Sequence, residues 1–187
     1  MKGQDSVQGA ITGEGARHYA GHEKWAGIMY RGVAATIGRS ASQGRFLEMG
    51  AGPGFLAVML AAKYPGIQFT LVDLSPDMEK IAGYYIVRQR ADATKFNYIV
   101  GDVADAGFMA GLGQFDCVYS TFSLHHWEYP ELSLENLWHA VAPGGVLVIH
   151  DFRRIRWLAA MFGRGGLGQS MRAAFTPPEL AALALKI

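Results

Sequence analysis

The chain has 187 residues, of which 50% are hydrophobic and 18% are charged, and its formal net charge at pH 7 is +1. A length of this order fits one domain with its own core rather than two independent domains. The near balance of charge gives no general field for holding nucleic acid or an anionic membrane, so neither is expected as a partner.

Cysteine usage and hydropathy indicate the cellular setting. Cys117 is the single cysteine, which excludes an intrachain disulfide framework. We find no leader pattern and no apolar run of about 18 residues that would span a membrane. We therefore expect a soluble, cytoplasmic protein.

The first segments are helical in pattern. Residues 1–14 lack periodicity, and we expect a flexible N-terminus there. Apolar residues then recur at helical spacing up to residue 37, interrupted by Gly21, Gly27 and Gly32. We expect one or two broken helices within residues 15–40.

From residue 41 onwards, short apolar runs alternate with helical segments. The runs are FLEM, FTLVD, NYIVGD, FDCVYSTF and GVLVIHDF, and the helical segments cover residues 55–64, 76–90, 103–111 and 131–141. Pro76 behind Ser75 predicts a helix start, and APGG at 142–145 predicts the end of the last of these helices. Alternation of this kind predicts an α/β fold, with a doubly wound, mostly parallel sheet between two layers of helices.

The segment RFLEMGAGPGF places Gly50, Gly52 and Gly54 directly after the first predicted strand. In a doubly wound fold this loop meets a helix N-terminus, whose free N–H groups attract polar ligand groups. The dinucleotide pattern G-x-G-x-x-G is not met, because Phe55 stands where its third glycine would be. Taken alone, the loop is equally compatible with a plain tight turn.

Acidic residues end three successive predicted strands, namely Glu48, Asp73 and Asp102. An acid in the position of Asp73 can accept hydrogen bonds from both hydroxyls of a ribose. Each acid alone is compatible with a turn or a helix cap. Together with the glycines, they indicate a nucleotide-like ligand at the carboxyl edge of the sheet.

The segments EMGAGPG, LVDLSPDM, GDVAD, FDCVYSTFSLHHW and APGGVLVIHDF, in this order, resemble the class I S-adenosylmethionine-dependent methyltransferases. The resemblance is strongest to the small-molecule branch that includes ubiquinone and menaquinone biosynthesis enzymes, and it covers roughly residues 42–152. It implies a Rossmann-like domain over residues 41–187 behind a helical lid at 15–40. The implied cofactor is S-adenosyl-L-methionine, the by-product is S-adenosyl-L-homocysteine (SAH), and the acceptor is a small molecule.

The resemblance also implies roles for the loop and the second strand. Glu48, Gly50, Gly52 and Gly54 match the first family motif, whose backbone holds the methionine part of the cofactor. Asp73 matches the ribose-binding acid. On this reading the loop is bare because the methionine part runs over it.

Further residues match the family at the next strand ends. The resemblance places Met78 against the adenine, and Asp102 with Val103 at the adenine edge. It places Ser120 and Thr121 near the reactive methyl group.

His125 and His126 follow the fourth predicted strand, where the acceptor should lie. Methyl transfer from a sulfonium is an in-line displacement that depends chiefly on orientation. A hydroxyl or acidic carbon acceptor would benefit from a general base, and histidine suits neutral pH. The alternative is that the pair is architectural, with one ring packed on the sheet.

The N-terminal helices have two candidate roles. Tyr19, Trp25 and Tyr30 are candidates to line the acceptor pocket, although aromatic residues at helical spacing also fit a simple core. His18 and His22 are four residues apart, as metal ligands can be. No glutamate forms an H-E-x-x-H pattern and no third ligand is apparent, so no metal is expected.

The C-terminal third holds the main concentration of positive charge, formed by Arg153, Arg154, Arg156, Arg164 and Arg172. These residues suit an anionic acceptor such as a carboxylate or phosphate, or simply a solvated face. GRGGLG at 163–168 matches G-x-G-x-x-G in letters but follows a helical pattern, so we expect a flexible loop there.

The family core usually has seven strands, whereas this chain stops at Ile187 within a predicted helix that starts at Thr176 and Pro177. The last two strands are therefore expected to be missing, through truncation or as a natural five-strand form. An uncovered fifth strand is an edge that invites pairing, so a homodimer is expected.

Three functions are compatible with the sequence. The first is methyl transfer to a small molecule through oxygen, nitrogen, sulfur or carbon. The second uses the same cofactor for different chemistry, and the third is a non-catalytic binding or assembly module on the same fold. The glycines and acids favour a ligand-binding protein, whereas missing strands favour the module.

Overall fold

The computed structural model describes residues 13–14, 23–155 and 166–187. Five parallel strands form one sheet in the order β3-β2-β1-β4-β5. They are β1 (Gly44–Met49), β2 (Ile67–Asp73), β3 (Phe96–Val100), β4 (Phe115–Thr121) and β5 (Val141–His150). The predicted parallel α/β sheet is confirmed.

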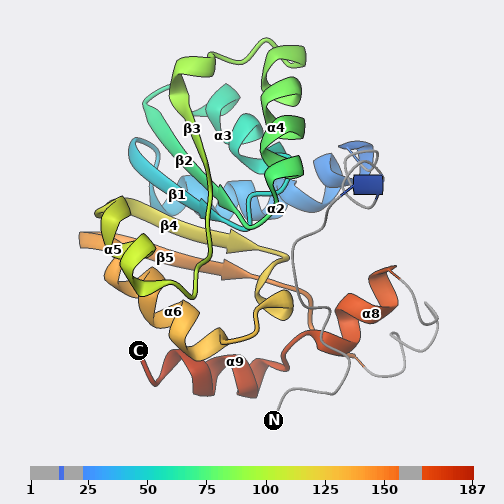
Figure 1. The fold of residues 1–187 in the computed structure, drawn as a ribbon, viewed down its shortest axis with the longest axis vertical. Helices are drawn as coiled ribbons and strands as arrows, with labels where there is room; N and C mark the ends of the chain where they lie inside the picture. The colour runs from blue at the N-terminus through green and yellow to red at the C-terminus, as the bar shows by residue number, and fades with distance from the viewer. Residues whose placement is uncertain (1–12, 15–22, 156–165) are drawn as a thin grey trace.

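Helices cover both faces of this sheet (Figure 1). One layer contains α2 (Glu23–Ser40), α3 (Phe55–Lys63) and α4 (Pro76–Arg88), and the other contains α5 (Ala106–Leu112), α6 (Pro130–His139) and α9 (Pro177–Ala184). The helix α8 (Gly166–Ala173) follows β5, and single turns η1 (Ala93–Lys95) and η2 (Leu124–His126) complete the described elements. The three-layer arrangement matches the prediction.

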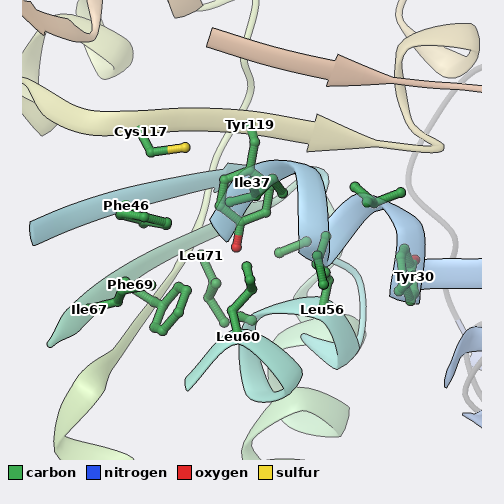
Figure 2. Close-up of a cluster of buried hydrophobic side chains, with 14 of the residues drawn as sticks. Tyr30, Ile37, Phe46, Leu56, Leu60, Ile67, Phe69, Leu71, Cys117 and Tyr119 are labelled. Atoms are coloured by element: carbon green, nitrogen blue, oxygen red, sulfur yellow. The ribbon is translucent and has the colours of Figure 1, made fainter. Parts of the chain in front are cut away.

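The strand β1 is buried on both faces, which explains its continuous apolar run. Phe46 packs with Ile37 of α2 and with Leu60 of α3, and Figure 2 shows Tyr119 of β4 reaching into the same cluster. Leu47 points into the opposite cluster, which α5, α6 and α9 cover. Two cores, one on each side, fix the register of the sheet.

Several predicted boundaries are confirmed, while two are wrong. Ser75 caps α4 as predicted, because its hydroxyl accepts a hydrogen bond from the Met78 N–H at 3.4 Å. The APGG segment lies inside β5 instead of ending a helix, and the pairing with β4 shifts there, with Gly144 at φ 80°. Residues 163–165 of the predicted loop lie outside the described residues, and the prediction is wrong for the remainder, since Gly166 already begins α8.

The helix α2 continues through Gly27 and Gly32, so the predicted breaks at these glycines do not occur. Packing of Val33 and Ile37 against α3 and the sheet outweighs the weak helix propensity of glycine. No helix among the described residues is long and apolar enough to cross a membrane.

Candidate functional site

A cavity of about 220 Å³ lies at the carboxyl ends of β1 to β4. Most of the predicted site residues line it: Gly50, Gly52, Asp73, Met78, Asp102, Val103, Thr121 and His126. The structure thus brings together residues up to 76 positions apart in sequence, counted from Gly50 to His126. Glu48, Gly54, Ser120 and His125 do not line this cavity.

The glycine loop has a backbone that only glycine adopts readily. Gly50, Gly52 and Gly54 have φ values of 70°, 51° and 73°. A Cβ atom at Gly50 would also stand 2.1 Å from the Oγ of Ser123. The N–H groups of Gly50 and Ala51 donate to the carbonyl of Val72 at 2.8 and 3.0 Å, which anchors the loop to β2.

Asp73 at the end of β2 is bonded to this loop. Its carboxylate accepts hydrogen bonds from the N–H of Gly52 and of Ser75, each at 2.9 Å. Burial raises the pKa of Asp73, and these N–H groups partly offset the rise. Tyr98 of β3 holds the loop from the other side, since its hydroxyl donates to the Gly52 carbonyl at 2.7 Å. Tyr98 was not predicted as a site residue.

Glu48 lies beneath the loop, with 2% of its surface exposed. The hydroxyl of Tyr119 donates to Glu48 Oε2 at 3.1 Å, and the Ala57 N–H in the first turn of α3 also bonds to the carboxyl group. Burial, reinforced by the charge of Asp73, raises the pKa of Glu48 to about 8. Glu48 therefore supports the start of α3 from inside the core.

The turn after β3 is held from two directions. Asp102 Oδ1 accepts a hydrogen bond from the Ala104 N–H at 2.9 Å. Asn136 of α6, which is 7% exposed, donates through Nδ2 to the Val103 carbonyl at 2.9 Å. The peptide group between Val103 and Ala104 is thus bonded at both ends. No sequence signal pointed to Asn136, because a single asparagine in a helix is unremarkable in pattern.

The segment after β4 forms another part of the cavity wall and lies against the glycine loop. Phe122 has a positive φ of 53°, which is strained for a phenylalanine. Its ring contacts Tyr30 of α2, with centroids 5.6 Å apart. Trp127 Nε1 donates to Ser123 Oγ at 3.0 Å, which holds Ser123 against Gly50. The strained backbone at Phe122 lies where the chain leaves β4 and enters the cavity wall.

The two histidines occupy different environments. His125 is 1% exposed, and its Nδ1 and backbone N–H both bond to Asp151, at 2.7 and 2.8 Å. His126 is half-buried and lines the cavity, with its ring centroid 4.0 Å from that of His125. Asp151 was not predicted, although it ends the run GVLVIHD in the way that the other acids end their strands.

The remaining predicted site residues fall partly outside the described ranges. Tyr19, His18 and His22 lie there, as does the side chain of Trp25, whereas Tyr30 is buried in the core. Within the described residues no group of three His, Cys, Asp or Glu could hold a metal ion.

The predicted arginine cluster is only partly described. Arg154 is ion-paired with Glu179 of α9, and Arg153 is exposed. Arg172 lies on α8, while Arg156 and Arg164 lie outside the described residues. A common arginine face is therefore not visible in this part of the chain.

Comparison with known proteins places this geometry in context. Residues 47–147, more than half of the chain, match the family model described as methyltransferase domain. The chain is 30% identical over 129 residues to demethylmenaquinone methyltransferase of Thermus thermophilus, covering 68% of this chain and 56% of that relative. It is 33% identical over 103 residues to trans-aconitate 2-methyltransferase of Paracidovorax citrulli, covering 55% of this chain and 36% of the relative.

A solved structure shares the fold. The plantazolicin methyltransferase BamL, in complex with SAH and a triazolic desmethylPZN analog, superimposes with a TM-score of 0.71 at 14% identity. The match covers 90% of this chain and 64% of that one. The chain spans between a third and just over half of the two curated relatives above.

Proposed function

The chain belongs to the S-adenosylmethionine-dependent methyltransferase family, and we propose that it transfers a methyl group from S-adenosyl-L-methionine to a small-molecule acceptor. The acceptors in the relatives' names, demethylmenaquinone and trans-aconitate, support the small-molecule class. The family match favours methyl transfer over the two alternatives considered from sequence, a different reaction of the same cofactor and a non-catalytic module.

The observation that carries the proposal is the bond between Asp73 and the glycine loop. The Gly52 N–H donates to Asp73 Oδ2 at 2.9 Å, which fixes an acid beside a loop whose Gly50 and Gly52 have positive φ. The cavity beside them is lined by Gly50, Gly52 and Asp73 and also by Met78, Asp102 and Val103. A ligand with an amino acid part, a ribose and a base fits this set of groups.

Each residue would bind the part of the cofactor that the family resemblance implies. The methionine part would lie along the backbone of Gly50 and Gly52, whose N–H groups are bonded to Val72 and Asp73, and Asp73 would accept hydrogen bonds from the ribose hydroxyls. Met78, Asp102 and Val103 would enclose the base. Glu48, Gly54 and Ser120 lie outside the cavity wall, so we assign Glu48 and Gly54 to support of the loop.

When bound, the cofactor supplies an electrophilic methyl group on a sulfonium, so the protein chiefly has to orient the acceptor. Thr121 and His126 lie in the wall on the β4 side of the cavity. We assign the role of general base to His126, because it reaches the cavity whereas His125 is buried against Asp151. His125 then has an architectural role.

Isothermal titration of S-adenosyl-L-methionine and SAH tests the proposal. We expect micromolar binding of both by the wild type and a loss of about tenfold or more in Asp73→Asn, which weakens charged hydrogen bonds to the ligand. Asp92→Asn is the matched control, since Asp92 caps the exposed turn η1 far from the cavity. A folded wild type that binds neither compound would refute the proposal.

We further propose that the acceptor is anionic and is met by arginines after β5. Arg153 is exposed just beyond the strand, next to the segment that holds His125. Arg153→Gln should raise the Michaelis constant of the acceptor and leave that of the cofactor unchanged. Arg45→Gln serves as the control, because Arg45 lies over the Phe115 ring at the opposite end of the sheet. Equal acceptor constants in Arg153→Gln and wild type would contradict the proposal.

We also propose a homodimer through β5. Within the described residues this strand pairs with β4 alone, and a strand with an open edge offers unpaired N–H and carbonyl groups. Light scattering at several concentrations should report twice the monomer mass. A monomer at all concentrations would contradict it.

A further inference from the structure

Ser133 on α6 lies in the cavity wall and is fully shielded from solvent, with 0% of its surface exposed. Among the described residues, its Oγ has no hydrogen-bond partner. Serine within a helix often bonds through its hydroxyl to the carbonyl four residues earlier. Here the carbonyl of Tyr129 accepts the backbone N–H of Ser133 at 2.9 Å, and the hydroxyl makes no such bond.

A buried hydroxyl without a partner is unfavourable, since it loses its bonds to water and gains none. Native proteins rarely retain such a group unless something else satisfies it. Because Ser133 lies in the cavity wall, a ligand that displaces the atoms now covering its hydroxyl is the available partner.

The position of Asn136 shows which part of a ligand lies near Ser133. The two residues are three positions apart, so they share one face of α6 at a separation of about 4.5 Å along its axis. Asn136 Nδ2 bonds to the Val103 carbonyl at 2.9 Å, so this face of α6 lies against the turn after β3. That turn carries Asp102 and Val103, the residues assigned to the base.

We propose that the Ser133 hydroxyl hydrogen-bonds the purine base of the cofactor, and that Asn136 is a positioning residue that holds the turn for that base. This inference rests on the proposed function, because it requires a nucleoside in the cavity. On this inference the binding site includes residues of α6 as well as the loops at the strand ends. Ser133 would contact the ligand directly, whereas Asn136 would act through Val103.

Titration of Ser133→Ala with SAH and with 5′-methylthioadenosine tests the direct contact. The second compound keeps the base and ribose but lacks the amino acid part. Loss of one hydrogen bond should weaken both affinities by roughly three- to tenfold. The melting temperature of the ligand-free variant should stay equal or rise, because the substitution removes an unpartnered buried hydroxyl. Ser40→Ala, a surface change at the end of α2, is the control.

Asn136→Leu tests the positioning role, with Asn136→Ser as a second variant if the first does not fold. The readout is the ratio of the affinities for SAH and for S-inosyl-L-homocysteine, which carries an oxygen in place of the adenine amino group. A displaced turn should bring the ratio of the two affinities closer to one. A purely structural defect would weaken both affinities equally and leave the ratio unchanged. An unchanged ratio in both variants would overturn the role of Asn136.

The outcomes for Ser133 separate the inference from the proposed function. A folded wild type that binds no SAH would refute the function itself. Wild-type binding with full affinity in Ser133→Ala would refute the contact and leave the function standing. A loss with SAH but not with 5′-methylthioadenosine would place the hydroxyl at the amino acid part, which contradicts a contact with the base.

Discussion

Tyr119 of β4 and Glu48 of β1 form a hydrogen bond inside the core, with the tyrosine hydroxyl 3.1 Å from Glu48 Oε2. Both side chains are almost fully buried, at 0% and 2% exposure. Burial opposes the charged form, so the pKa of Glu48 rises from 4.5 to about 8. At neutral pH this carboxyl group is therefore mainly protonated beneath the glycine loop.

The stability of the protein should accordingly depend on pH through Glu48. In the unfolded chain the group loses its proton near pH 4.5, whereas in the folded protein it keeps the proton up to about pH 8. Its contribution to stability is fully present below pH 4.5 and is lost as the pH rises towards 8. The Glu48→Gln variant has no carboxyl group here and does not lose this stability. As the pH rises, its free energy of unfolding should therefore increase relative to that of the wild type, by up to about 1.4 kcal/mol per pH unit.

Urea unfolding of both proteins between pH 5 and 8 measures this difference. Glu135→Gln is the control, because Glu135 is an exposed glutamate on α6 and its replacement should give no such slope. A constant difference between Glu48→Gln and wild type over this range would show that Glu48 is ionised in the folded protein.

Gly50→Ala should damage the loop for two separate reasons. Its φ of 70° costs an alanine about 1–2 kcal/mol, and its Cβ would overlap Ser123 Oγ at 2.1 Å. We expect the affinity for SAH to fall by about tenfold or more. Adding Ser123→Gly should restore part of it, because the overlap disappears while the strain stays. Gly83→Ala on α4, where nothing lies within 4 Å of the new methyl group, should bind normally. Equal affinity in Gly50→Ala and wild type would contradict this account of the loop.

Tyr98→Phe removes the hydroxyl that donates to the Gly52 carbonyl at 2.7 Å. The loss of one part-buried hydrogen bond should lower the free energy of unfolding by about 1 kcal/mol. It should also weaken SAH binding by about two- to tenfold, because the loop loses its support from β3. Tyr84→Phe, on the exposed face of α4, is the matched control. If Tyr98→Phe lowers stability but not affinity, the loop is held sufficiently by Val72 and Asp73 alone.

The sequence predicted the sheet and the place of the site because both depend on local patterns. Apolar runs of strand length predict the strands. Gly50, Asp73 and Asp102 mark where three of these strands end, and the ends of parallel strands meet at the carboxyl edge of the sheet. The APGG segment misled the prediction, because its glycine and proline suggested a turn. In the structure the segment is instead an irregular part of β5, where the register of pairing with β4 shifts.

Residues that support the site from a distance could not be predicted. Tyr98 and Asn136 each form one bond, and Asp151 forms two, to a residue far away in sequence, at separations of 46, 33 and 26 positions. Single polar residues of this kind leave no periodic signal. The different burial of His125 and His126 likewise follows from the position of Asp151 at the end of β5, which only the folded chain defines.

Replacing Asp151 and His126 in turn should distinguish a residue that stabilises the fold from a residue that takes part in methyl transfer. The Asp151 carboxylate accepts hydrogen bonds from Nδ1 and the backbone of His125 and from the Phe152 N–H. Asp151→Asn leaves one acceptor oxygen for these donors, so the free energy of unfolding should fall by about 1–3 kcal/mol. His126→Gln should change stability less, yet slow methyl transfer by about 100- to 10,000-fold if the acceptor must lose a proton.

Denaturant unfolding and a pH profile of turnover distinguish these effects, because a lost general base also removes the acidic limb of the profile. SAH titration of both variants controls for an intact cofactor site. An unchanged profile in His126→Gln, with normal SAH affinity, would show that the acceptor is already nucleophilic when it binds. In that case both histidines serve to build the wall of the cavity, and orientation alone accounts for the reaction.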